Sequence, residues 1–245
     1  MKHSEKTIFI SNWIKDYINS MPSQAKSLVI GISGGIDSSV SSTLSAMTGL
    51  KTIVLSMPIK QKSLQHDLSL KHQEWLIKNF KNVEAHTVNL DQLFESFKLS
   101  LSKFKNALGF ANSRARLRMV SLYQVAAATR GIVVGTGNKV EDFGVGFYTK
   151  YGDGGVDISP LGDCNKTDVW EMGKELKILK EIIDADPTDG LWDDGRTDED
   201  QLGLKYSELE EAMNNPNSPN REKYEKIRKL NLHKMGPIPV CKIPN

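Results

Sequence analysis

The stretch Ser27-Leu-Val-Ile-Gly-Ile-Ser-Gly-Gly-Ile-Asp-Ser-Ser39 joins a short apolar run to a glycine-rich polar loop. The run over 27–31 predicts a buried strand, and the apolar spacing over 36–47 predicts a helix directly after the loop. Gly34 and Gly35 allow a tight turn and a close approach of the backbone to a ligand. Free N–H groups at a helix start favour an anion. The stretch therefore predicts a phosphate-binding loop between a strand and a helix.

Further strand patterns occur at 52–56, 83–88 and 132–136, and helical patterns at 63–80, 91–105, 113–130 and 166–179. Strands that alternate with helices are typical of parallel βαβ units, so we expect an α/β fold with a doubly wound, mostly parallel sheet. Loops after the strand C-termini then share one edge, where such sheets bind ligands.

We expect one domain over 1–245, with an N-terminal helix at 4–20 and a nucleotide-binding core over about 25–182. A covering loop and a helical C-terminal part should occupy about 183–245. The loop 185–203 contains six Asp, one Glu and one Pro, and it is too long for an idle connection. Short helices are expected near 207–214 and 220–232, followed by an extended tail over 233–245.

The overall composition restricts the class of protein. With 32 Lys+Arg against 30 Asp+Glu, the chain lacks the basic surface expected of a general nucleic-acid binder. Cys164 and Cys241 lie far apart and form no metal motif. No signal peptide and no membrane-length apolar run is visible, so we expect a cytoplasmic protein with no membrane partner.

The loop itself differs from two common phosphate motifs. It lacks the lysine of a Walker A loop and the third glycine of a dinucleotide loop. Asp37 would repel phosphate unless a cation lies between them, and Mg²⁺ is the ordinary solution. The plainer interpretation is a glycine turn with an Asp-Ser cap.

Ser33-Gly-Gly-Ile-Asp-Ser-Ser39 resembles the SGGxDS[ST] loop of the N-type ATP pyrophosphatases. That superfamily includes NAD, GMP, argininosuccinate and asparagine synthetases and tRNA-modifying ligases. The resemblance implies an adenine nucleotide alpha hydrolase-like fold and a loop that holds the pyrophosphate leaving group. By itself it does not indicate the second substrate.

Three further segments narrow the resemblance to ammonia-dependent NAD synthetases. They are Asn112-Ser-Arg-Ala-Arg-Leu-Arg-Met119, then Val134-Gly-Thr136 with Glu141, then Gly146-Phe-Tyr-Thr-Lys-Tyr-Gly-Asp-Gly-Gly-Val-Asp157. The resemblance covers roughly residues 25–240. It implies a ligase that uses ATP to amidate deamido-NAD with ammonia through an acyl-adenylate, releasing AMP and pyrophosphate.

The resemblance also implies site residues. ATP would contact Gly31, Ile32, Ser33, Gly34, Gly35, Ile36, Asp37, Ser38, Thr136, Lys166 and Thr188. Deamido-NAD would contact Arg116, Lys150, Asp157, His233 and Lys234. Asp37 and Glu141 would hold Mg²⁺, and the catalytic set would be Asp37, Asp153 and Lys166, with Asp153 assisting ammonium deprotonation.

For several of these residues a structural interpretation stays open. Arg114, Arg116 and Arg118 near a predicted helix start oppose its dipole, which favours an anionic ligand over a solvated basic face. Lys150 could be a surface lysine. Asp153 and Asp157 could cap turns.

The expected partners are deamido-NAD, ATP and ammonia. No glutaminase segment is visible, so ammonia would come from solution or from a separate protein. The resemblance implies a homodimer that shares the dinucleotide site; the N-terminal helix would form part of the interface or pack on its own domain.

Two other functions stay open. One is a different adenylating ligase that acts on a tRNA base or a small carboxylate. The balanced charge disfavours a tRNA substrate. The other is a non-catalytic nucleotide sensor, which has less need of both Asp37 and Glu141.

Overall fold

A parallel sheet organises the chain in the computed structural model, which describes residues 1–60, 63–192 and 196–244. Its strands are β1 (Leu28–Gly31), β2 (Thr52–Ser56), β3 (Val83–Thr87) and β4 (Ile132–Val133), in the order β3-β2-β1-β4. Every pairing is parallel. The predicted α/β class with a parallel sheet is therefore confirmed.

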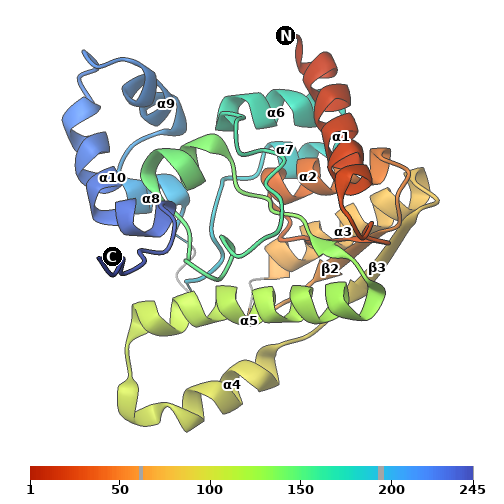
Figure 1. The fold of residues 1–245 in the computed structure, drawn as a ribbon, viewed down its shortest axis with the longest axis horizontal. Helices are drawn as coiled ribbons and strands as arrows, with labels where there is room; N and C mark the ends of the chain where they lie inside the picture. The colour runs from red at the N-terminus through yellow and green to blue at the C-terminus, as the bar shows by residue number, and fades with distance from the viewer. Residues whose placement is uncertain (61–62, 193–195, 245) are drawn as a thin grey trace.

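Helices cover both faces of the sheet because successive strand residues point to opposite sides. Leu28 and Ile30 of β1 belong to one core with α1 (His3–Ser20), α2 (Ile36–Met47), α3 (Ser63–Asn79), α6 (Lys166–Glu175) and α7 (Lys180–Ile183). Val29 joins the opposite core, with α4 (Asp91–Ser100), the short helix η1 (Ser102–Phe104) beyond it, and α5 (Ala107–Thr129). Figure 1 shows α5 and α4 below the sheet and α1, α2 and α6 above it.

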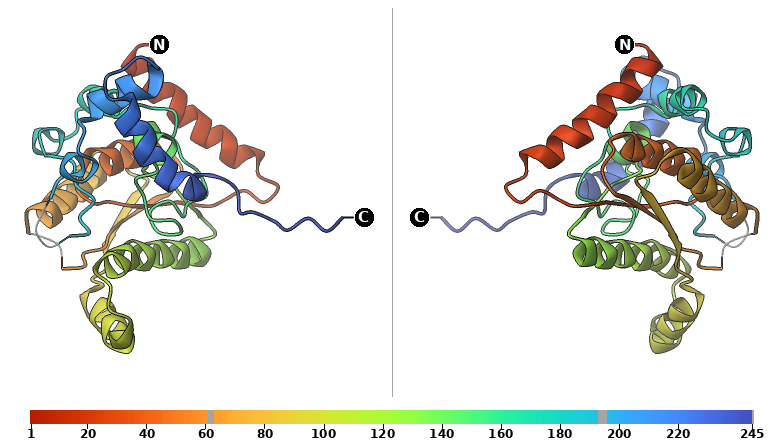
Figure 2. Two further views of the ribbon diagram at one scale, coloured as in Figure 1. Left: turned by 90° about the vertical axis from the view of Figure 1, so that its left-hand side faces the viewer. Right: turned by 90° about the vertical axis from the view of Figure 1, so that its right-hand side faces the viewer.

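A third apolar cluster lies beside the sheet and builds a helical lobe. It packs α8 (Asp198–Leu202), α9 (Tyr206–Asn214) and α10 (Arg221–Met235) around η2, a π-helix over Lys139–Val145. The π-helix follows β4 directly, so this lobe sits against the C-terminal edge of the sheet. After α10 the exposed tail projects away from the body (Figure 2).

Several boundaries differ from the expectation. Helix α5 begins at Ala107, capped by the Asn106 side chain, which accepts from Gly109 N. Arg114, Arg116 and Arg118 therefore lie inside the helix, and the argument from the dipole at its start was wrong. The covering loop contains α8, and α10 extends to Met235, so His233 and Lys234 are helical rather than in an extended tail. Each shift reflects packing that single-sequence periodicity does not show.

The N-terminal helix packs on its own chain through one face. Ile10, Ile14 and Ile18 of α1 are buried in the core with α2 and α6. The other face exposes Phe9, Trp13 and Tyr17. Across the described ranges, no helix has the length and apolar character needed to cross a bilayer.

A buried histidine links α3 to the serine-rich α2 and should make the fold sensitive to acid. His72 is fully buried, its Nε2 lies 3.0 Å from Ser42 Oγ, and burial lowers the pKa of His72 to about 4. Between pH 6.5 and 4, His72 is therefore protonated in the unfolded chain but neutral in the folded chain. The free energy of unfolding, measured by urea titration, should therefore fall as the pH is lowered through this window. We predict that this fall is smaller in His72→Gln, by about 3 kcal/mol at most. An unchanged pH dependence would contradict this role of His72.

Candidate active site

The phosphate-binding loop is preorganised by its own serines. The Ser38 hydroxyl donates to Gly35 O at 3.0 Å and accepts from Ser33 N at 3.2 Å, while Ser39 Oγ donates to Gly35 O at 2.9 Å. These bonds shape the turn between β1 and α2, and the first N–H groups of α2 have no partner within the helix. The Ile36 side chain is buried, and its Cδ1 packs against Gly173 of α6. The loop thus has the geometry of an anion site.

The loop forms one wall of a cavity of about 550 Å³ at the C-terminal edge of the sheet. All the residues expected to contact ATP line this cavity, and so do Glu141 and Asp153. Arg118 and Met119 of α5 and the segment 184–191 close other sides. The structure therefore brings together residues that stand far apart in the sequence.

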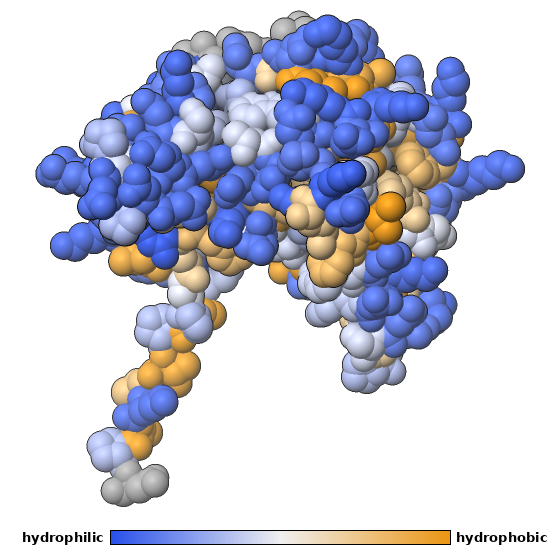
Figure 3. Space-filling model, turned by 90° about the horizontal axis from the view of Figure 1, so that it is seen from above, coloured by the Kyte–Doolittle hydropathy of each residue, from blue (hydrophilic) through white to orange (hydrophobic). Residues whose placement is uncertain are grey.

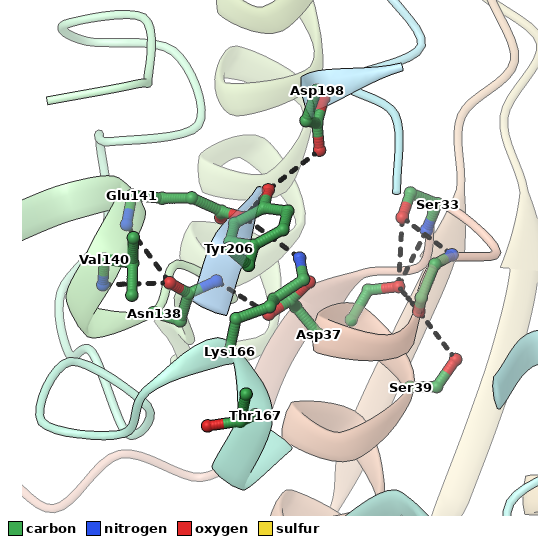
Figure 4. Close-up of polar contacts among 12 residues, drawn as sticks. Ser33, Asp37, Ser39, Asn138, Val140, Glu141, Lys166, Thr167, Asp198 and Tyr206 are labelled. Atoms are coloured by element: carbon green, nitrogen blue, oxygen red, sulfur yellow. Dashed lines mark hydrogen bonds and ion pairs between the residues drawn. The ribbon is translucent and has the colours of Figure 1, made fainter. Parts of the chain in front are cut away.

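A buried lysine occupies the centre of the polar wall. Lys166 is 2 % exposed, and its Nζ lies 2.5 Å from Asp37 Oδ2 and 2.9 Å from Glu141 Oε1 (Figure 4). Burial alone would lower the pKa of Lys166, but the two carboxylates reverse this and raise it. Burial raises the pKa of Asp37, whereas Lys166 and Tyr206 outweigh burial and lower the pKa of Glu141. The three side chains thus form an ion group in which the Lys166 ammonium lies between the carboxylates of Asp37 and Glu141.

Neighbouring polar groups fix the two carboxylates. Asn138 Nδ2 donates to Asp37 Oδ1 at 2.9 Å, and Asn138 Oδ1 accepts from the N–H groups of Val140 and Glu141. The same side chain therefore caps the π-helix and orients the carboxylate of the phosphate loop. The Tyr206 hydroxyl donates to Glu141 Oε1 at 2.6 Å.

Asp153 lines the same cavity as the phosphate loop. Its Oδ1 accepts from Thr149 N at 3.0 Å, and Thr149 Oγ1 in turn lies 2.8 Å from Asn112 Oδ1 of α5. One side of Asp153 is open to the cavity, but desolvation by the surrounding protein raises the pKa of Asp153 to about 6. A carboxyl group with such a pKa can take up and release a proton near neutrality.

Four of the expected dinucleotide contacts form a separate basic group outside the cavity lining. Arg116 Nε donates to Lys150 O at 3.3 Å, Lys150 Nζ to His233 O at 3.3 Å, and Lys234 Nζ to Tyr148 O at 2.8 Å. Arg116 is exposed on α5. The group joins α5 to the end of α10.

Asp157, the remaining expected contact, is held elsewhere. It accepts from Tyr123 Oη at 3.0 Å and from Val133 N at 2.7 Å. It therefore ties α5 to the β4 edge. These bonds occupy both carboxylate oxygens with groups of the fold.

Residues 184–191 and Asp198 line part of the cavity, and hydrogen bonds fix them there. Arg114 Nη1 donates to Leu191 O at 3.1 Å, and the Gln201 side chain bonds both Asp189 Oδ2 and Trp192 Nε1. Asp198 N donates to Pro187 O at 3.0 Å. Arg114 of α5 therefore anchors this stretch, and the other bonds join the described residues 184–192 to those of 196–203.

Sequence reasoning missed four residues of this site. Asn138 stands between Thr136 and Glu141 in a loop already expected at the ligand edge, so its amide could have been considered. Arg118 lines the cavity, whereas the motif had favoured Arg116. Tyr206 and Asp198 lie in the helical lobe, and no sequence signal connects them with β4.

The arrangement defines an ATP-binding α/β enzyme: a serine-rich anion loop, a buried lysine and two carboxylates at the edge of a parallel sheet. Comparisons with known proteins agree. The family model described as NAD synthase matches residues 7–240. A curated NH(3)-dependent NAD(+) synthetase from Carboxydothermus hydrogenoformans is 36 % identical over 217 residues, which are 85 % of this chain and 84 % of that protein.

Solved structures extend the similarity over the whole chain. An NMN synthetase from Francisella tularensis has a TM-score of 0.89 at 34 % identity, covering 100 % of this chain and 99 % of that one. An NH3-dependent NAD synthetase from Campylobacter jejuni has a TM-score of 0.79 at 22 % identity, covering 99 % and 100 %, and supports the fold. The chain belongs to the NAD synthase family and is an ATP-dependent carbon–nitrogen ligase.

The phosphate loop depends on glycine at position 34. Gly34 has φ +92°, and a Cβ there would lie 2.5 Å from Gln65 O. We predict that Gly34→Ala abolishes ATP binding measured by calorimetry. Gly49→Ala is the matched control, because Gly49 has φ +75° with nothing within 4 Å; it should cost about 1–2 kcal/mol of stability and leave ATP binding intact. Equal ATP affinity in both variants would contradict this account of the loop.

Proposed function

We propose that this chain amidates deamido-NAD with ammonia and ATP, forming NAD, AMP and pyrophosphate. The observation that carries the proposal is the buried Lys166 between Asp37 and Glu141, directly beside the phosphate loop, in a chain of the NAD synthase family. A carboxylate is a poor acyl donor, so adenylation is needed before nitrogen can attack.

In the first step a carboxylate oxygen of the substrate attacks the α-phosphorus of ATP, and the bond to pyrophosphate breaks. The loop 31–38 presents its N–H groups and serine hydroxyls to the phosphates. Lys166 supplies a positive charge where negative charge develops on the leaving group.

The donor set fits a magnesium ion. Asp37 and Glu141 present carboxylate oxygens that already converge on one cation, Lys166 Nζ. Oxygen ligands of this kind suit Mg²⁺. A bound Mg²⁺ would neutralise the charge of the pyrophosphate; the chain's own part is to hold both carboxylates in place through Asn138 and Tyr206.

In the second step ammonia attacks the activated carbonyl carbon, and the bond to AMP breaks. Ammonium must first lose a proton. Asp153 is the candidate acceptor, because above pH 6 its carboxylate form is available at the cavity wall. Below that pH the carboxylate is lost and the amidation step should slow.

Activity tests the proposal directly. With ATP, Mg²⁺, deamido-NAD and ammonium, we predict that the protein forms pyrophosphate and NAD in equal amounts. A coupled dehydrogenase assay measures the NAD. Asp37→Asn should lower both by at least about 10²-fold, because it removes a carboxylate that holds Lys166 in place and that would bind the Mg²⁺. Asp163→Asn is the control, since the Asp163 side chain is 96 % exposed. Release of pyrophosphate without formation of NAD would contradict the assignment of deamido-NAD as the substrate. If no carboxylate substrate leads to pyrophosphate release, the result would favour a nucleotide sensor.

A second candidate substrate is nicotinate mononucleotide. The favouring observation is the similarity over the full length to an NMN synthetase, at 34 % identity and a TM-score of 0.89. In this case the same chemistry would act on the smaller carboxylate, and the basic group around Arg116 and Lys150 would lack an adenylyl moiety to hold.

A competition experiment with the two substrates distinguishes the two assignments. We predict that kcat/KM for deamido-NAD exceeds that for nicotinate mononucleotide by at least about tenfold, and that Arg116→Ala removes most of this preference while sparing turnover of the mononucleotide. One remote anionic contact corresponds to roughly this factor. A preference for the mononucleotide that Arg116→Ala leaves unchanged would reverse the assignment.

We further propose a homodimer that shares the dinucleotide site. The support is a set of large apolar side chains exposed on α4, η1 and α5, with Leu99 76 %, Phe104 77 %, Leu108 58 % and Val120 58 % exposed. Arg116 lies one turn before Val120 on α5. The exposed tail, with Ile238, Val240 and Ile243 (Figure 3), is a further candidate contact. The exposed face of the N-terminal helix, with Phe9, Trp13 and Tyr17, is the other candidate interface.

Light scattering with size-exclusion chromatography tests the interface. We predict that Val120→Asp yields a monomer, because a charge buried in an apolar interface is costly. Ile77→Asp on α3, where Ile77 is 52 % exposed, should stay dimeric. A dimer in both variants, or a monomeric parent chain, would contradict the proposal. A cytoplasmic location and an ammonia-supplying partner protein are also proposed, from the sequence alone.

A further inference from the structure

The central cation of the site stands at an unfavourable place in its own helix. Lys166 is the first residue of α6, and the positive end of a helix dipole disfavours an ammonium group there. Its Nζ nevertheless reaches Asp37 Oδ2 at 2.5 Å and Glu141 Oε1 at 2.9 Å. Both contacts depend on the position of the helix start, because a small displacement of the first turn would separate the ammonium from the carboxylates.

A carboxylate from another helix holds this first turn. Glu210 of α9 is 9 % exposed; its Oε1 accepts from Thr167 N at 2.9 Å and its Oε2 from Thr167 Oγ1 at 2.7 Å. Thr167 directly follows Lys166 (Figure 4), and its N–H is one of the first of the helix, which lack a partner within the helix. A negative charge at this point also suits the helix dipole and balances the neighbouring ammonium.

The same face of α9 holds the other side of the ion group. Tyr206 lies four residues before Glu210, so both side chains project from one face of the helix. The Tyr206 hydroxyl donates to Glu141 Oε1 at 2.6 Å, and its ring meets Trp170 of α6 edge-on, with 5.9 Å between centroids. One rigid helix therefore contacts both the start of α6 and the carboxylate that Lys166 must reach.

A second anchor of α6 is more exposed to solvent. Asp168 Oδ1 lies 2.7 Å from Lys6 Nζ and 3.3 Å from His3 Nε2 of α1. The side chains of Lys6 and Asp168 are 27 % and 20 % exposed. Ion pairs that water reaches contribute little, whereas the two bonds of Glu210 are shielded by the packing of α9 on α6.

We infer that Glu210 is a positioning residue for Lys166. It fixes Thr167, and with it the first turn of α6, so that the Lys166 ammonium stays between Asp37 and Glu141. Glu210 itself does not belong to the cavity lining in the described part of the chain, so it acts through Thr167 and not on a reactant. For the kinetic test the inference rests on the proposed function, whereas the labelling test needs no substrate.

Trace acetylation of the ligand-free protein measures the position of the Lys166 amine. In the parent chain the buried and paired amine should react slowly with acetic anhydride, and mass spectrometry of chymotryptic peptides gives its rate relative to Lys180, which is 83 % exposed. Glu210→Ala should raise this relative rate about tenfold, because two hydrogen bonds to a charged group are lost. Thr167→Val removes only the hydroxyl bond and should raise it about threefold.

Two further variants distinguish positioning from general stability. Glu210→Gln keeps an oxygen that accepts from Thr167 N and an amide that donates to Thr167 Oγ1, so labelling should stay within about twofold of the parent chain. Glu211→Ala is the matched control, because this exposed neighbour on α9 accepts from Asn215 and Ser218, away from α6. It should label like the parent chain, and melting temperatures verify that all variants are folded.

Kinetics should show the same order of variants. We expect Glu210→Ala to lower kcat for pyrophosphate release about tenfold and to change the KM for ATP less than about threefold, because a misplaced charge is felt mainly in the transition state. Glu210→Gln should restore kcat to within about threefold of the parent chain. Glu211→Ala should leave both constants unchanged.

The outcomes separate the inference from the proposed function. Labelling of Lys166 that is unchanged in Glu210→Ala and Thr167→Val, or Glu210→Gln that behaves like Glu210→Ala, would overturn the inference. An equal loss of kcat in Glu211→Ala and Glu210→Ala would also overturn it. If the labelling order holds but the parent chain forms no amide product, the proposed function is refuted and the role of Glu210 stands.

Discussion

The charge of Lys166 is the constraint on which the site depends. A buried ammonium group is stable only with charged partners, and here Asp37 and Glu141 supply them at 2.5 and 2.9 Å. The ion group cannot be interpreted as a stability device, because desolvation offsets most of such a gain. It keeps two carboxylates together beside an anion loop, where each would otherwise repel the other and the ligand.

The rest of the fold can be understood as the means of bringing these groups to one place. Asp37 comes from the start of α2, Glu141 from the π-helix after β4, and Lys166 from the first residue of α6. Parallel strands place the first two at the same edge of the sheet. The π-helix is a local distortion of the kind common at functional sites. Tyr206 then ties the helical lobe to the same oxygen that Lys166 contacts.

Sequence analysis predicted the parts governed by local periodicity. The strands β1 and β2 and the helix α2 follow apolar patterns, and the glycine loop between β1 and α2 has its own chemistry. Sequence analysis failed where contacts between residues far apart in the chain determine the structure. The α5 start depends on the Asn106 cap, which places Arg118 in the cavity and Arg116 on the surface. Tyr206 owes its role to packing of α9 on the π-helix, which no spacing in the chain reveals.

The proposed function requires Asp37 and Glu141 to hold a divalent cation beside the bound nucleotide. Electron paramagnetic resonance of Mn²⁺, titrated with a non-hydrolysable ATP analogue, tests this most directly. The account predicts one tightly bound Mn²⁺ per chain in the presence of the analogue, weakened at least about tenfold by Glu141→Gln. Mn²⁺ binding that is unchanged in Glu141→Gln would contradict it.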